Sequence, residues 1–434
     1  MCRLKLPRMK KRKIPGQNKL TRETGIGLKG DRESAMRIGT PGFVPARLEQ
    51  ARAARRIKTQ KELAAMLGVQ PSAVSRWESG ESAPEAETLS TLAATLNVRR
   101  EFFLRPITPS ERPMFQRAQS SNLVVDIRYQ KSQMSWLQEI SSVLQHYVDF
   151  PPVDIPDVLG SVSWKQLRED DIERIALDLR AHWKMGEGPC GDMVALLERI
   201  GVIVGTLEMG TSRLDGLCSW SPEDERPHIL LATDKMCFPR RQMDAAHELA
   251  HAILHRNVTE DEFRDNLEEI ERQAFRLAGA FLMPSTTYPY EVERVSLAQL
   301  LALKGRWRTS VGAQIRRLAD LDVIDNDEKT DLYKLRSAKG WTKEEPLDRE
   351  WPLSEPRVLR DTLNLLVSSG ARTKADLLAV EFIAPASDIE RLTSLPSGWF
   401  TEKEGLLVQW KRASDQQRDT FEGTGSIVPF PRKS

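Results

Sequence analysis

Apolar residues recur at helical spacing through most of the chain. Several short helical patterns with clear stops fill residues 43–106, and a longer one aligns Trp136, Ile140, Val143 and Leu144 before "DFPPVDIP" ends it. The runs "GVIVGTLE" and "PHILLATD" predict short strands, and the helical pattern returns after "LMPS". This order of elements predicts a mainly α fold with a small α+β part.

Prolines and polar stretches divide the chain into segments. The stretch "ITPSERP" at 107–113 is typical of a linker, and we expect it to place the two candidate functional sites described below on separate cores. The last helical segment, in the C-terminal region, is expected to pack against and support the central domain or to bind a partner. The predicted segments are a disordered basic extension (1–40), a helical domain (43–106), a linker and connecting helix (107–160), an α+β domain (161–340), a C-terminal helical region (341–410) and a flexible tail (411–434).

Charge and composition exclude several classes of protein. A formal net charge of +2 excludes a strongly basic histone-like protein but leaves room for a local nucleic-acid surface. No apolar run approaches the roughly 18 residues of a membrane span, and no apolar stretch follows the basic start as in a secretory signal. The four cysteines lie far apart without a CxxC pair, which indicates reduced thiols in a cytoplasmic protein.

The stretch "MDAAHELAHAILHR" at 243–256 places three histidines and a glutamate on one expected helix. His247 and His251 are four residues apart, so both imidazoles can reach one ion. Glu248 lies on the same side and can act as a general base towards water. This is the HExxH arrangement of zinc hydrolases. His255 lies about 12 Å along the axis from His247, so we expect it to support a ligand from behind or to have a structural role.

A catalytic zinc site needs a third protein ligand, and "NLEEIERQAFRLAGAFLMP" at 266–284 offers candidates. Glu271 shares a helical stripe with two alanines, where another helix can approach closely. Glu268 lies one turn earlier on that stripe and is the runner-up. Glu269 lines up with Gln273 and Arg276, which predicts a solvent-facing side.

The region 47–98 resembles the Cro/repressor-type, or XRE, helix-turn-helix. Thr59 caps a predicted helix, Gly68 supplies a tight turn, and a second helix from about Gln70 ends by Gly80. Such a second helix enters the major groove of DNA. The expected DNA-contacting residues are Gln60, Gln70, Ser72, Ser75 and Arg76, with Gln60 on a phosphate and Arg76 on a guanine. The expected local positive charge comes from Arg47, Arg52, Arg55, Arg56 and Lys58.

The stretches "AAHELAHAILH" and "IERQAFRLAGAFLMP" resemble the ImmA/IrrE family of zinc metallo-endopeptidases, over about residues 165–325. The resemblance implies a zincin-like domain in which His247, His251 and Glu271 hold Zn²⁺ and Glu248 is the base. Departures from the family pattern at Ala250, Phe275 and Leu277 touch no proposed ligand.

The two resemblances together predict a DNA-binding regulator fused to a zinc endopeptidase. Its expected partners are double-stranded operator DNA and a protein substrate, either a helix-turn-helix repressor or a toxin or antitoxin partner, and we also expect a homodimer. One alternative is a regulator or antitoxin-like protein whose peptidase-like domain only binds a partner or senses a signal. Another is a hydrolase that uses the same site on a small amide.

Overall fold

The computed structural model describes residues 39–107, 113–115, 124–210, 215–233 and 237–401. The predicted extension and tail therefore lie almost entirely outside the described residues. The helices are α1 (Pro45–Ala54), α2 (Gln60–Leu67), α3 (Pro71–Ser79), α4 (Ala86–Thr95), η1 (Arg100–Leu104), α5 (Val124–Gln145), η3 (Trp164–Gln166), α6 (Glu169–His182), α7 (Met193–Arg199), α8 (Phe238–Leu254), α9 (Glu260–Asp265), α10 (Leu267–Leu282), η4 (Tyr288–Glu291), α11 (Leu297–Trp307), α12 (Val311–Asp320), α13 (Asn326–Ala338), α14 (Val358–Ser368), α15 (Lys374–Asp376), the π-helical turn η5 (Leu377–Glu381) and α16 (Ala386–Leu392). The strands are β1 (Ile203–Leu207), β2 (Gly216–Trp220) and β3 (Pro227–Ala232).

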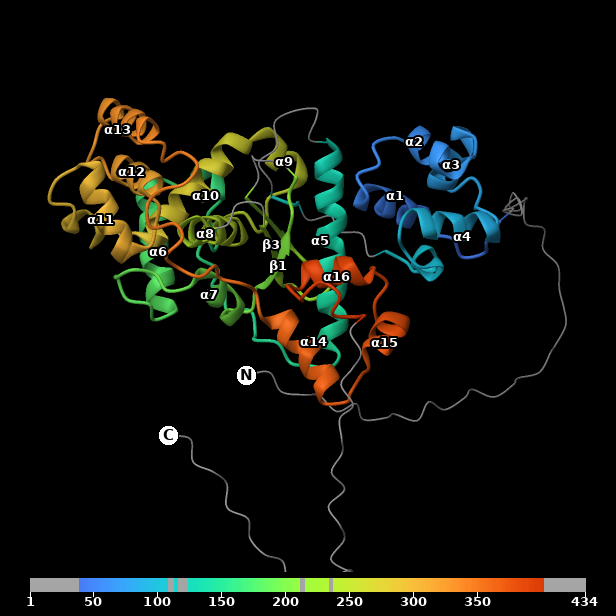
Figure 1. Ribbon diagram of the computed structural model, residues 1–434. Helices are drawn as coiled ribbons and strands as arrows, with labels where there is room; N and C mark the ends of the chain where they lie inside the picture. The colour runs from blue at the N-terminus through green and yellow to red at the C-terminus, as the bar shows by residue number, and fades with distance from the viewer. Residues whose placement is uncertain (1–38, 108–112, 116–123, 211–214, 234–236, 402–434) are drawn as a thin grey trace, which may run out of the picture. The chain divides into compact units, whose positions relative to one another are not determined.

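The predicted fold class is confirmed, because helices dominate and the strands form one small sheet (Figure 1). The strand order is β1-β3-β2, with β1 parallel and β2 antiparallel to β3. None of the helices in the described ranges is long and apolar enough to cross a membrane.

The helix-turn-helix forms where its capping residues predict it. The Thr59 hydroxyl accepts a hydrogen bond from the Glu62 backbone N–H at 3.1 Å, which starts α2. Gly68 adopts φ +67°, a left-handed conformation that costs glycine little, and the chain turns there into α3. Val74 and Trp77 are buried, and this fixes which face of α3 remains exposed.

The sheet is buried on both faces, so its strands are mostly apolar, and polar residues such as Ser219 and His228 are buried in them rather than alternating with apolar ones. Successive residues nevertheless enter different cores. Val204 and Ile229 pack towards α8 and α10, whereas Ile203 and Leu230 pack towards α5 and the C-terminal helices. The sheet therefore separates two hydrophobic cores, one on each of its faces.

The second of these cores is continuous with that of the helix-turn-helix. Leu48 of α1 belongs to the same cluster as Trp136 of α5, Leu230 of β3 and Leu392 of α16. Figure 1 shows the long helix α5 between α1 and the sheet, and α1 and β3 both contact it. Helix α5, which follows the predicted linker, thus shares a core with the helix-turn-helix, whereas α8 and α10 pack in the other core.

Candidate metal centre and DNA-binding surface

Helix α8 carries the HExxH residues, and α10 packs against it more extensively than any other described element. Small residues suit this close approach, since Ala246 and Ala250 of α8 and Ala274 of α10 are all buried in the same core cluster. The stripe predicted from the sequence is thus a helix–helix contact, and it brings Glu271 opposite the two histidines.

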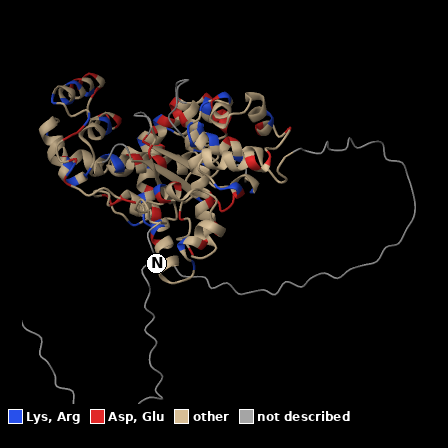
Figure 2. Ribbon diagram, turned by 45° about the vertical axis from the view of Figure 1, so that its right-hand side comes forward, with Lys and Arg blue, Asp and Glu red and all other residues tan. Residues whose placement is uncertain are grey.

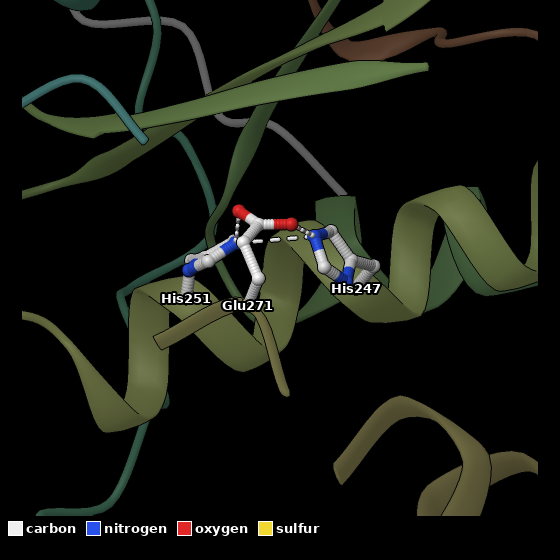
Figure 3. A group of neighbouring side chains, drawn as sticks. All are labelled: His247, His251 and Glu271. Atoms are coloured by element: carbon white, nitrogen blue, oxygen red, sulfur yellow. Dashed lines mark hydrogen bonds and ion pairs between the residues drawn. The ribbon is translucent and has the colours of Figure 1, made fainter. Parts of the chain in front are cut away.

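His247, His251 and Glu271 converge on one point, as Figure 3 shows. The Nε2 atoms of the two histidines lie 3.1 Å apart. The Glu271 carboxylate places Oε2 at 3.5 Å from His247 and Oε1 at 3.4 Å from His251. Ligands about 2.0–2.1 Å from a tetrahedral zinc ion are separated by roughly 3.3 Å. The spacing of these donors therefore fits such an ion.

Unsatisfied polar atoms point to the same conclusion. All three side chains are buried, and neither Glu271 oxygen has a hydrogen-bond partner among the described residues. Contacts with His247 and His251 hold the pKa of Glu271 below its ordinary value, although burial acts in the opposite direction. Burial lowers the pKa of His251 to about 4, so its ring is neutral near pH 7 and can be a ligand.

Glu248 lies beside this group and against the sheet. Burial, with repulsion from Glu271, raises the pKa of its carboxyl well above the ordinary value. A Cβ atom placed on Gly216 of β2 would lie only 2.5 Å from Glu248 Oε1, so the glycine makes room for this carboxylate. Figure 3 shows strands of the sheet passing above the helix that bears the histidines.

A hydrogen-bonded chain of side chains orients His251. Gln273 Nε2 donates to the Trp164 carbonyl at 3.0 Å and to Glu269 Oε1 at 2.9 Å, so its own oxygen faces His255. His255 Nε2 donates to that oxygen at 3.1 Å, and its Nδ1 accepts from His251 Nδ1 at 3.1 Å. The lone pair of His251 Nε2 is thereby directed at Glu271. His255 thus contacts a proposed ligand from behind, in agreement with its predicted supporting position.

One interpretation of α10 was wrong. Gln273 and Arg276 were expected to face solvent with Glu269, but both are buried. Arg276 forms ion pairs with Glu169 and Glu173 of α6, which covers that side of α10. Glu268 is exposed and is absent from the converging group, in line with its rank as runner-up.

On the helix-turn-helix, four of the five expected DNA contacts are exposed: Gln70, Ser72, Ser75 and Arg76. Gln60 is half-buried, and its Nε2 donates to Glu78 Oε2 at 2.7 Å. Its proposed phosphate contact stays a prediction, with one N–H already engaged inside the domain.

The prediction that five basic residues supply a positive surface for DNA was largely wrong. The four arginines among them form ion pairs within the protein. Lys58 is exposed, and Figure 2 shows acidic and basic residues mixed over the helices rather than sorted into separate regions. The pairs are Arg47 with Glu139, Arg52 with Glu78, Arg55 with Asp388, and Arg56 with Asp126.

The fold and the converging group define a protein with a helix-turn-helix domain and an α+β domain that carries a candidate metal centre. Family models agree: a helix-turn-helix model matches residues 48–103, and the model of the IrrE N-terminal-like domain matches residues 197–319. The chain is therefore a fusion of an XRE-type helix-turn-helix with an ImmA/IrrE-type domain. No curated protein matched the chain.

Proposed function

We propose that the chain is a DNA-binding regulator with a zinc-dependent endopeptidase that cleaves a protein partner, of which a helix-turn-helix repressor is the first candidate. The observation that carries the proposal is the convergence of His247, His251 and Glu271, buried and with unsatisfied carboxylate oxygens, beside Glu248. Zn²⁺ held by those three residues would supply Lewis-acid chemistry towards a peptide carbonyl.

Glu248 has the role of general base. Its carboxylate extends from α8 and lies against Gly216 of β2. It accepts a proton from the attacking water and passes it to the leaving amine. Zn²⁺ bound by the three ligands would favour the ionised form of the Glu248 carboxyl and so would oppose the effect of burial on its pKa. The exposed face of α3, with Arg76, would read operator DNA in the major groove.

The test uses the zinc-loaded full chain and small helix-turn-helix repressors encoded beside it. Wild-type protein should cleave such a partner at a defined bond, and Glu248→Gln should retain zinc and DNA binding while losing cleavage. Partner binding without cleavage by the wild-type protein would instead support the antitoxin-like or sensing alternative. Cleavage of small amides but not of intact proteins would favour the other hydrolase.

A further inference from the structure

The outer edge of β2 lies beside the candidate metal centre. β2 is the terminal strand in the order β1-β3-β2, and its other edge is fully paired with β3. It contacts α8, and its Gly216 abuts the Glu248 carboxylate. A chain that paired with this outer edge would therefore pass close to the proposed base.

Residues 113–115 already occupy this edge. The Phe115 backbone N–H donates to the Cys218 carbonyl at 2.9 Å, in an isolated antiparallel bridge. The Phe115 ring lies parallel to that of His251, with 5.0 Å between centroids and 6° between planes. It also meets Phe263 edge-on at 5.3 Å, and only 1% of Phe115 is exposed.

The described part of this segment is short and buried, with Met114 in the core cluster around α5 and Phe115 in that of α8 and α10. β2 and β3 pair over five residues, whereas a single bridge joins 113–115 to β2 among the described residues. The backbone hydrogen bond of Phe115 and the contacts of its buried ring are of a kind that an extended segment of another chain can supply at the same place. An extended peptide that adds to a free strand edge gains affinity from the backbone and specificity from side-chain pockets.

We propose that residues 113–115 are a resident occupant of the outer edge of β2, and that an extended segment of the protein substrate must displace them to reach the candidate metal centre. The substrate is an extended, antiparallel segment with an aromatic or large apolar side chain at the position of Phe115. Gly216 lies two residues, or about 7 Å, from Cys218 along β2, so such a segment continues past Glu248. The inference rests on the proposed function, whose substrate class it specifies.

The position of the occupant in the chain gives this contact a regulatory meaning. Residues 113–115 lie between η1 of the helix-turn-helix region and α5. The substrate thus competes with the segment that joins the DNA-binding domain to the rest of the protein. A full-length chain should therefore bind an added strand weakly until that segment is released.

The experiment measures binding of a fluorescent peptide with the sequence of residues 108–120, "TPSERPMFQRAQS", to the full zinc-loaded chain by anisotropy. Phe115→Ala should bind the peptide at least tenfold more tightly than the wild-type protein, because its own occupant is weakened. A peptide N-methylated at its phenylalanine lacks the N–H that Cys218 accepts and should lose this binding.

Phe275→Ala is the matched control, because Phe275 packs on the other histidine, with ring centroids 4.1 Å apart, and belongs to α10. Equal peptide binding by wild type and Phe115→Ala would overturn the proposal. So would binding that survives N-methylation, or an equal gain in Phe275→Ala. If Phe115→Ala does not fold, Phe115→Leu removes the flat ring but keeps an apolar side chain, and the same comparisons apply.

Neither peptide binding nor zinc content depends on hydrolysis, so the two proposals can fail separately. Peptide binding as expected without cleavage of any repressor would contradict the peptidase and leave the proposal for residues 113–115 standing. Cleavage that needs Glu248, with no effect of Phe115→Ala on peptide binding, would support the peptidase and contradict the proposal for residues 113–115.

Discussion

Substitution of Gly216 by alanine should disable the proposed base without touching a metal ligand. The new Cβ atom would lie 2.5 Å from Glu248 Oε1, 2.7 Å from its Cγ and 2.9 Å from its Cδ. Ordinary van der Waals contact begins at 3.4 Å, so the carboxylate must move by about 0.9 Å (3.4 minus 2.5). The strand itself cannot easily retreat, because β2 is hydrogen-bonded to β3 along its length.

A displacement of about 1 Å in a catalytic group lowers rates by roughly 10²-fold, equivalent to about 2.7 kcal/mol in the activation barrier. We therefore expect Gly216→Ala to retain one zinc per chain and to cleave the repressor partner about a hundredfold more slowly. Metal analysis and single-turnover cleavage on the same preparation give both values.

Gly279→Ala is the matched control, because it lies on α10 and its added Cβ would meet only Arg317 Cδ, at 3.6 Å. This variant should cleave at the wild-type rate. If Gly216→Ala cleaves within threefold of wild type, the position of Glu248 against β2 is not what orients the base, and the reasoning is refuted.

Three further predictions concern the ligands, their support and the DNA-binding face. Glu271→Ala should abolish tight zinc binding, whereas Glu268→Ala should leave it unchanged; zinc titration with a competing chelator decides, and the opposite pattern would refute the ligand assignment. His255→Ala should still bind zinc, but about 10- to 100-fold more weakly, because His251 loses the partner that orients it; an unchanged affinity would contradict that role. Arg76→Ala should cost about 1–3 kcal/mol on a specific site and much less on scrambled DNA, without altering the melting temperature. Arg52→Ala should instead destabilise the domain by about 3–5 kcal/mol, because it leaves Glu78 buried with its charge unpaired; thermal melts and gel shifts separate the two variants, and equal melting temperatures would contradict this.

The candidate metal centre was predictable because it depends on local helical geometry. Four-residue spacing fixes His247 and His251 on one face, and the alanine stripe of α10 identified the side on which Glu271 meets them. The same geometry misplaced Gln273, since a helical wheel assumes one solvated face and α6 covers the opposite side of α10. Phe115 gave no signal at all, because it lies in a linker without periodic neighbours.

The arginines show a second limit of sequence reasoning. Arg52 and Arg55 look like parts of a basic DNA-binding surface, but each has an acidic partner, Glu78 or Asp388, that is remote in sequence. Charge density along a sequence does not reveal such pairs. The exposed face of α3 was predictable, by contrast, because burial of Val74 and Trp77 determines it locally.

The sheet that divides the two cores also limits how the protein can be dissected. A fragment that begins at α5 would lose α1, which packs on that helix, and would expose apolar surface around Trp136 to water. Such a fragment should aggregate, and calorimetry of the intact chain should show the helix-turn-helix melting together with the sheet. Tests of DNA binding and of hydrolysis by this protein therefore call for point variants of the whole chain rather than isolated halves.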